Sequence, residues 1–197
     1  MTEITNILYV IIHTVIAIIT FMLSLRILLE LTKVDFFNPI SQSTDRFTRP
    51  FMKLLGFLPS ILGFNLQAFF AASFIQFIGA LTLITLSGNR LPDFITIGIL
   101  SSISTLGIII FSIKWSLIGS IILSWIAPTA DHPAAQLISQ ICEPFLKKIR
   151  LYLPSFSGLD FSPIILILIL HIIEIVMNSV SQKFNGEVFL QFFLGIS

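Results

Sequence analysis

The sequence predicts an all-α polytopic membrane protein in which four transmembrane helices form two parallel two-helix repeats. Each repeat is expected to carry an amphipathic cytoplasmic linker that lies in the membrane interface. Three observations lead to this prediction: an apolar composition, four long apolar runs, and a proline-bounded phrase that occurs twice. The phrase reads "PFMKLLGFLPSI" at 50–61 and "PFLKKIRLYLPSF" at 144–156.

The composition excludes several classes of protein. Of 197 residues, 55% are hydrophobic and only 11% are charged, and the mean hydropathy is +1.00, which leaves too little polar surface for a soluble domain. A net charge of +1 argues against a nucleic-acid partner, because neutralising phosphates requires clustered cations. The single cysteine, Cys142, excludes an intrachain disulfide, a cysteine-cluster zinc site and a C-x-x-C-H haem attachment. No nucleotide-binding, metalloprotease or hydrolase motif occurs, so we expect neither an enzyme nor a bound cofactor or metal.

Four apolar runs are long enough to cross a bilayer, which takes about 20 residues. The spans are expected at 7–31, 64–86, 102–125 and 161–180. Residues 94–101 either lie along the interface or extend the third helix. Ser162 is the expected N-cap of the fourth helix, with Pro163 at the first helical position. The tail 183–197 is too short to span and is expected to rest on the membrane surface.

Loop charges predict the orientation of the chain. The long connections 32–60 and 128–160 carry seven cations, whereas the opposite side carries only Arg90 and Lys183. By the positive-inside rule, both long connections then lie in the cytoplasm and both termini lie outside. The opening "MTEITN" lacks the positively charged start of a cleavable signal, so the first run is expected to remain as a helix.

The two halves of the chain echo each other, as expected after a duplication. Repeat 1 takes in residues 1–88 and repeat 2 takes in residues 89–182. The matched positions are Pro39 with Pro133, Pro50 with Pro144, Lys53 with Lys147 and, after one inserted residue, Pro59 with Pro154. Each unit crosses the membrane twice and returns to its starting side. Two such units are therefore parallel repeats, related by an axis along the membrane normal.

Each linker is expected to form two short helices divided at a proline, Pro50 in the first linker and Pro144 in the second. Asn38 is the expected N-cap of the first linker, and Asp131 or His132 that of the second. The apolar side chains of the repeated phrase recur at helical spacing. The cations beside them, which can reach lipid headgroups or a protein partner, are Lys53, Lys147, Lys148 and Arg150. The linkers are either structural anchors that set the tilt of the spans, or a docking surface or gate.

Ionisable residues inside the spans are costly and often functional. Lys114 and Glu174 lie at similar depths on adjacent antiparallel helices, so we expect them to pair directly or through water. One interpretation is structural: the pair locks two helices together, or Lys114 snorkels outward on its long stem. The other is an ion or proton path that involves Glu174 and His171, three residues apart on one helix face.

Two further polar residues of the spans are candidates. Gln76 occupies the position that matches His171 in the other repeat, and the two are expected to face each other and hydrogen-bond between helices. Arg26 is expected to pair with Glu30, four residues later, near the inner boundary of the membrane.

Several segments resemble the two halves of the YggT family of bacterial inner-membrane proteins. They are "LRILLELTKVDFFNPISQ", "RPFMKLLGFLPS", "SWIAPTADHP" and "PFLKKIRLYLPSFSGLDFSPIILILIL". The similarity covers about residues 5–182. Its most specific part is "LPSFSGLDFSP", which contains Asp160 and Pro163.

The resemblance implies a multi-pass protein of the bacterial inner membrane that contributes to ion or osmotic homeostasis linked to potassium uptake. Two repeats of two spans would need to form a homo-oligomer to enclose a path. The alternative is a non-transporting scaffold or assembly factor, for cell division or for maturation of a membrane complex such as a cytochrome. In that case the cytoplasmic linkers would bind a membrane-protein partner. In both cases the lipid bilayer is the first partner.

Overall fold

The computed structural model describes residues 3–126, 132–153 and 160–184. Within these residues the regular elements are helices and one short hairpin, joined by turns and loops. The elements are α1 (Glu3–Leu31), α2 (Pro39–Met52), a 3-10 helix η1 (Lys53–Leu55), β1 (Ser60–Ile61), β2 (Phe64–Asn65), α3 (Leu66–Leu86), α4 (Phe94–Ile126), α5 (Pro133–Arg150) and α6 (Ser162–Lys183).

Four helices, α1, α3, α4 and α6, are long and apolar enough to cross a membrane, which confirms the four expected spans. The third span is longer than predicted, because α4 is one unbroken helix of 33 residues. At 1.5 Å per residue it is about 50 Å long, compared with about 30 Å for the hydrocarbon core of a bilayer. Residues 94–101 therefore extend this helix and do not form a separate interfacial segment.

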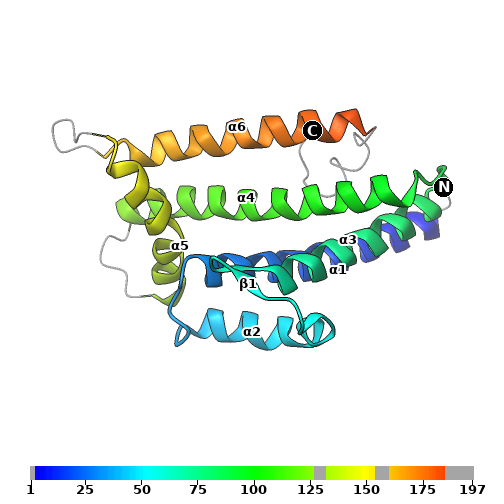
Figure 1. The fold of residues 1–197 in the computed structure, drawn as a ribbon, viewed down its shortest axis with the longest axis horizontal. Helices are drawn as coiled ribbons and strands as arrows, with labels where there is room; N and C mark the ends of the chain where they lie inside the picture. The colour runs from blue at the N-terminus through cyan, green and yellow to red at the C-terminus, as the bar shows by residue number, and fades with distance from the viewer. Residues whose placement is uncertain (1–2, 127–131, 154–159, 185–197) are drawn as a thin grey trace.

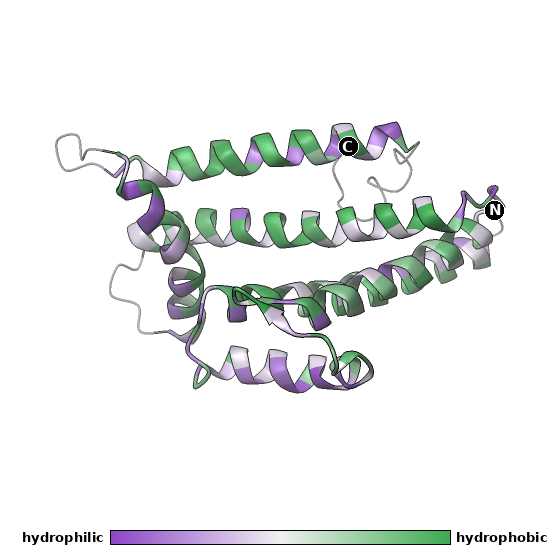
Figure 2. Ribbon diagram, in the orientation of Figure 1, coloured by the Kyte–Doolittle hydropathy of each residue, from purple (hydrophilic) through white to green (hydrophobic). Residues whose placement is uncertain are grey.

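The four long helices lie side by side, with α6 at one edge of the bundle (Figure 1). α1 packs against both α3 and α4, whereas α6 packs on α4 and α5. The main core lies where the helices meet, and Leu23, Ile27, Ala72 and Leu117 are fully buried there. Green, hydrophobic residues dominate the long helices, and purple, hydrophilic residues are concentrated in α2 and α5 (Figure 2).

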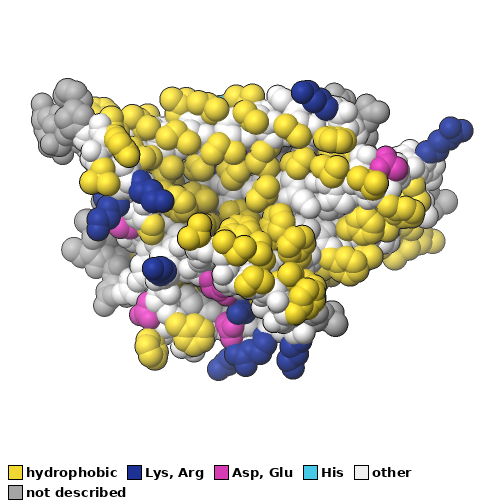
Figure 3. Space-filling view, viewed as in Figure 1, with side chains coloured by type: hydrophobic (Ala, Val, Ile, Leu, Met, Phe, Trp, Pro, Cys, Tyr) yellow, Lys and Arg dark blue, Asp and Glu magenta, His cyan; other side chains and the backbone are white. Residues whose placement is uncertain are grey.

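The two linkers take different directions relative to the bundle. α5 crosses its end, as an interfacial helix would, whereas α2 folds back beside the long helices and runs along them (Figure 1). Both linkers were expected to lie in the membrane interface, and the direction of α2 along the long helices does not fit that expectation. Its buried face, formed by Ser41, Thr44, Thr48 and Met52, packs on the bundle, so contacts with protein set its direction. The cations of α2 face outward at the lower edge of the molecule (Figure 3).

The prolines do not divide the linker helices as the sequence predicted. Pro50 lies inside the last turn of α2, and Pro144 lies inside α5, which continues to Arg150. A proline inside a helix removes one backbone hydrogen bond. Tertiary packing compensates, because buried residues lie on both sides of each proline. In α5 these include Ile141 and Leu146.

Capping explains where several helices begin. Asn38 Oδ1 accepts from the backbone N–H of Ile40, and His132 Nδ1 accepts from that of Ala134, which confirms both as N-caps. Asp131, the other option, lies outside the described residues. Ser162 is not the cap of α6 but its first residue. Its N–H donates to Asp160 Oδ1 at 2.9 Å, so Asp160 performs the capping function.

A short antiparallel hairpin joins η1 to α3, and the sequence did not predict it. Ser60 pairs with Asn65 and Ile61 with Phe64. The turn residues Leu62 and Gly63 both have positive φ, 52° and 86°. Gly63 sits close to the backbone of α1. The hairpin therefore directs the chain from α2 back against the end of α1.

The predicted duplication stays a prediction, as does the cytoplasmic location of the linkers. Pro39 and Pro133 both begin linker helices, and Pro50 and Pro144 both lie within them. Pro59 lies just before β1, whereas Pro154 is outside the described residues.

Candidate functional site: ionisable groups within the helix bundle

One ionisable contact within the long helices joins α4 to α6. Lys114 Nζ donates to both carboxylate oxygens of Glu174, at 2.6 Å to Oε1 and 2.7 Å to Oε2. The contact expected from the sequence is thus present. The side chains are 23% and 11% exposed, so bundle atoms cover most of both groups. Each residue lies twelve positions from a helix end, Ile126 of α4 or Ser162 of α6, which corresponds to about 18 Å along the axis.

His171 lies next to this pair. Its Nδ1 is 3.4 Å from Glu174 Oε2, and the helical spacing of three residues places the ring on the same side of α6. Unlike Glu174, its side chain is 61% exposed on the protein surface. The carboxylate therefore contacts both an ammonium and an imidazole. The imidazole nitrogen donates or accepts at this contact according to its tautomer.

Gln76 and His171 do not meet, contrary to the expectation from the repeat. Gln76 of α3 is fully buried, and neither of its amide atoms has a hydrogen-bond partner within the described part of the chain. α6 packs on α4 and α5, which leaves His171 on the outer edge of the bundle. Equivalent sequence positions thus occupy different surroundings.

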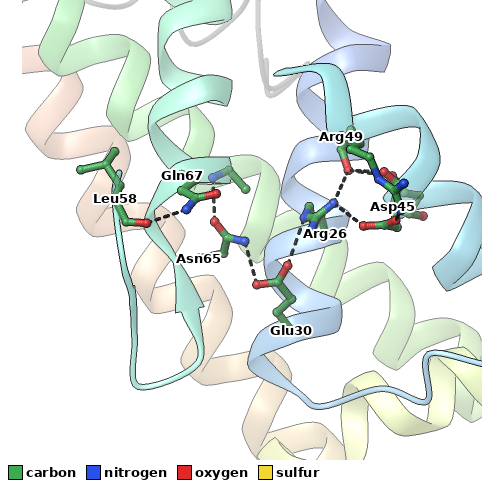
Figure 4. Close-up of polar contacts among 10 residues, drawn as sticks. Arg26, Glu30, Asp45, Arg49, Leu58, Asn65 and Gln67 are labelled. Carbon is green, nitrogen blue, oxygen red and sulfur yellow. Dashed lines mark hydrogen bonds and ion pairs between the residues drawn. The ribbon is translucent and has the colours of Figure 1, made fainter. Parts of the chain in front are cut away.

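A second ionic network lies where α1, α2 and α3 meet (Figure 4). Arg26 Nε lies 3.0 Å from Glu30 Oε1, the predicted pair, while its Nη1 lies 2.8 Å from Asp45 Oδ1. Arg49 pairs with the other oxygen of Asp45. Glu30 in turn accepts from Asn65 Nδ2 at 2.7 Å. The network ties α2 to α1, and α1 to the start of α3.

Sequence reasoning missed Asp45, Thr48 and Asn65 as members of this network. Thr48 Oγ1 accepts from Arg26 Nη1 at 3.0 Å and is fully buried. The signal in the sequence was the polar stripe of α2 at helical spacing, which entered none of our predictions. Partial burial by itself raises the pKa of Asp45, but hydrogen bonds from Arg49 and Arg26 outweigh burial and hold that pKa below its ordinary value.

The basic end of α5 is only partly free for other contacts. Arg150 pairs with Asp160 at 2.8 Å and with Glu143 at 2.9 Å, so it fastens the end of α5 to the start of α6. The hydrogen bond that Arg150 donates to Asp160 is the main reason that the pKa of Arg150 is raised above its ordinary value. The remaining linker cations are exposed, as predicted: Lys53, Lys147 and Lys148.

The two linkers contact each other directly. Asn38 Nδ2 donates to the carbonyl oxygen of Pro133 at 2.7 Å, and the N–H of Asp35 donates to Gln140 Oε1 at 2.9 Å.

Cys142, inside α5, is buried, and burial raises its pKa to about 12, so its thiol is unreactive. Across residues 3–126, 132–153 and 160–184, no three His, Cys, Asp or Glu side chains gather in a way that could hold a metal ion.

Comparison with known proteins places this architecture in a family. A family model described as CCB3/YggT matches residues 99–181, which include the Lys114–Glu174 pair. The chain is 33% identical over 178 residues to the protein YggT of Escherichia coli K12, covering 90% of this chain and 92% of that protein. The chain belongs to the CCB3/YggT family.

Another relative of this YggT-family chain is an uncharacterized protein of Pseudomonas aeruginosa, 36% identical over 173 residues, which cover 86% of this chain and 88% of that protein. The YggT protein of Escherichia coli is likewise described as uncharacterized. No solved structure matches. The protein is thus a multi-pass membrane protein of the YggT family with bacterial relatives.

Proposed function

We propose that the protein contributes to ion and osmotic homeostasis, linked to potassium uptake, in the bacterial inner membrane. The observation that carries this proposal is the Lys114–Glu174 pair, held beside His171 and about 18 Å along the helix axes from the α5-facing ends of α4 and α6, Ile126 and Ser162. A purely structural role would not require charge. Well-packed apolar residues can often replace a buried ion pair without loss of stability.

The geometry supports a carboxylate with two exchangeable states. In the state described here, the ammonium of Lys114 contacts both oxygens of Glu174. A cation or proton that reaches Glu174 competes with this ammonium, and the long flexible stem of Lys114 allows it to move away. His171 then provides a second group that can give or take a proton at the same carboxylate.

The described helices of one copy do not enclose a path around this group. Glu174 is contacted from α4 and α6, and α6 is the edge helix of the bundle (Figure 1). His171 lies on the uncovered side of that helix. We therefore include a homo-oligomer in the proposal, in which a second copy covers this side.

Flux measurements test the proposal. Purified protein in liposomes should release entrapped potassium faster than empty vesicles, and Glu174→Gln should abolish the difference. Glu143→Gln is the matched control, because Glu143 is an exposed carboxylate of α5 that also pairs with a cation. Equal flux from the wild type and a folded Glu174→Gln protein would contradict the proposed role of the pair. Flux no greater than that of empty vesicles would contradict transport by the protein itself.

A second candidate function, a non-transporting scaffold or assembly factor, is favoured by a different observation. The linkers contact each other through Asn38 and Pro133, and α5 adds the exposed cations Lys147 and Lys148 to the surface of the linkers. Such a surface suits a membrane-protein partner. A photo-crosslinker at position 148 that captures a specific membrane protein in cells, together with a negative flux result, would favour this function.

A further inference from the structure

The interior of the bundle contains polar side chains that have no protein partner. Thr20 and Ser24 of α1, Gln76 of α3 and Ser104 of α4 are each 0% exposed. Within the described part of the chain, their side-chain oxygens have no hydrogen-bond partner, and neither does Gln76 Nε2. We call these four residues the polar seam. Buried polar groups in native proteins are nearly always satisfied, so the seam requires a ligand.

The register of the helices places the seam residues at similar levels along the bundle. A Cβ at Gly79 would meet the side chain of Ile16, which fixes the antiparallel register of α1 and α3. One helical turn along from this contact, in opposite directions on the two helices, are Thr20 and Gln76. The register of α1 and α3 therefore places Thr20 and Gln76 at the same level along the bundle.

The register of α3 and α4 brings Ser104 to the same region. Ser73 Oγ donates to Thr105 Oγ1 at 3.3 Å, which aligns these two antiparallel helices. Gln76 is one turn from Ser73, and Ser104 is the neighbour of Thr105. The seam thus spans about two turns at the junction of α1, α3 and α4. Gln76 is ten residues from both ends of α3, which places the seam near the middle of the span.

The chemistry of the seam indicates which ligand it holds. Gln76 has both a donor and an acceptor without partners, and the three hydroxyl groups can serve as either. A metal cation would contact only oxygens and leave Gln76 Nε2 unsatisfied. Water donates and accepts, and a buried water needs two to four polar partners. No charged residue belongs to the seam, which also suits a neutral ligand.

We propose that the polar seam is an internal hydration site that holds ordered water in the middle of the membrane span. The site is separate from the Lys114–Glu174 pair and does not depend on the proposed function. The bound water joins α1, α3 and α4 in one hydrogen-bonded network, so their polar atoms are no longer unpaired. The interior of the bundle is therefore hydrated at this level.

Water contact can be measured directly at Gln76. In the full-length protein labelled with ¹⁵N-glutamine and placed in lipid bilayers, the Gln76 side-chain amide is identified as the signal that Gln76→Leu removes. Water-edited solid-state NMR should transfer magnetisation from water to this amide at short mixing times. Failure of transfer, with normal transfer to the exposed Gln182, would overturn the proposal.

Stability gives an independent test, because a wet seam and a dry seam predict opposite signs. If water bridges the seam, Gln76→Leu leaves the remaining hydroxyl groups unsatisfied and should lower the thermal midpoint by about 2–4 °C. If the seam is dry, the same change removes an unsatisfied amide and raises the midpoint. Thr20→Val, which keeps the shape and removes one hydroxyl, should follow the same sign and serves if Gln76→Leu does not fold. Gln182→Leu is the control, since Gln182 is exposed at the end of α6.

A final measurement separates water from a bound cation. The midpoint of the wild type should be equal in potassium, sodium and N-methylglucamine chlorides at one ionic strength. A rise specific to one alkali cation that Gln76→Leu abolishes would overturn water as the ligand in favour of that cation.

Discussion

Asn38 at the start of α2 donates a hydrogen bond to the carbonyl oxygen of Pro133, the first residue of α5. Asn38 caps the first linker helix and precedes Pro39, and Pro133 begins the second linker helix. Pro39 and Pro133 are matched positions of the predicted repeat. The bond joins segments that are ninety-five positions apart in the chain. It means that the two linkers meet at one end of the bundle and must lie on the same side of a membrane.

The first prediction concerns this residue. Asn38→Ala should destabilise the protein by about 2 kcal/mol, because it removes an N-cap, typically about 1 kcal/mol, and a hydrogen bond of similar value. Chemical unfolding in detergent measures the change. Asn89→Ala in the exposed turn between α3 and α4 is the control and should have little effect. An Asn38→Ala protein as stable as the control would show that the linkers are not held together by this contact.

The second prediction is a pH dependence that arises from Asp45. Its pKa is lower in the folded protein than the ordinary value of 3.8, mainly because the hydrogen bonds from Arg49 and Arg26 outweigh partial burial. A group with a depressed folded pKa contributes stability that is fully present above its unfolded pKa and is lost as the pH falls through the folded value. The free energy of unfolding should therefore decrease as the pH drops below about 4, and Asp45→Asn should make this decrease smaller.

Thermal unfolding of the two proteins between pH 7 and pH 3 measures the effect. At pH 7, Asp45→Asn should already be less stable than the wild type, and the two curves should converge on acidification. Parallel curves at every pH would mean that Asp45 makes no charge-dependent contribution.

The third prediction concerns the close approach of α1 and α3. A Cβ at Gly79 would come within 2.5 Å of Ile16 Cδ1, which is closer than side chains tolerate. Gly79→Ala should cost about 1–3 kcal/mol through overpacking. Ile16→Ala in the same chain should recover most of that loss by making room. Gly98→Ala is the matched control, because a Cβ there meets nothing within 4 Å. If the second substitution adds its own loss and gives no recovery, the register described for these helices is wrong.

The fourth prediction separates structure from function at the ion pair. Lys114→Met leaves Glu174 buried without its partner and should cost about 3–5 kcal/mol if the carboxylate stays charged. The double variant Lys114→Met, Glu174→Leu should regain most of the stability, because it leaves no uncompensated charge. The double variant should nevertheless show no potassium flux in liposomes. Normal flux from a stable double variant would mean that the pair only holds α4 and α6 together.

The sequence predicted the parts of this fold that depend on local composition. Long apolar runs define the four spans, and fixed helical spacing is enough to predict the Arg26–Glu30 contact. The contact of Lys114 with Glu174 followed from equal depth on antiparallel helices. Each of these predictions required only the geometry of an α-helix and the thickness of a membrane.

Features set by tertiary packing were not predictable in the same way. Pro50 and Pro144 suggested breaks, but packing on both sides keeps α2 and α5 continuous. Asp45 was not among the predicted residues, because only the fold brings it to Arg26, nineteen positions earlier. Gln76 was matched to His171 by the repeat, yet the edge position of α6 separates them. In each case a partner distant in the sequence determined the outcome.

The central prediction is that both linkers lie together on the cytoplasmic face, as the contact between them and the charges of the loops indicate. Labelling with a membrane-impermeant maleimide tests it most directly, using Arg46→Cys and Lys148→Cys singly in a Cys142→Ala background. Both positions are exposed in the structure. The account predicts that neither cysteine reacts in intact spheroplasts and that both react in inverted membrane vesicles. Reaction of one cysteine from each side of the membrane would contradict it.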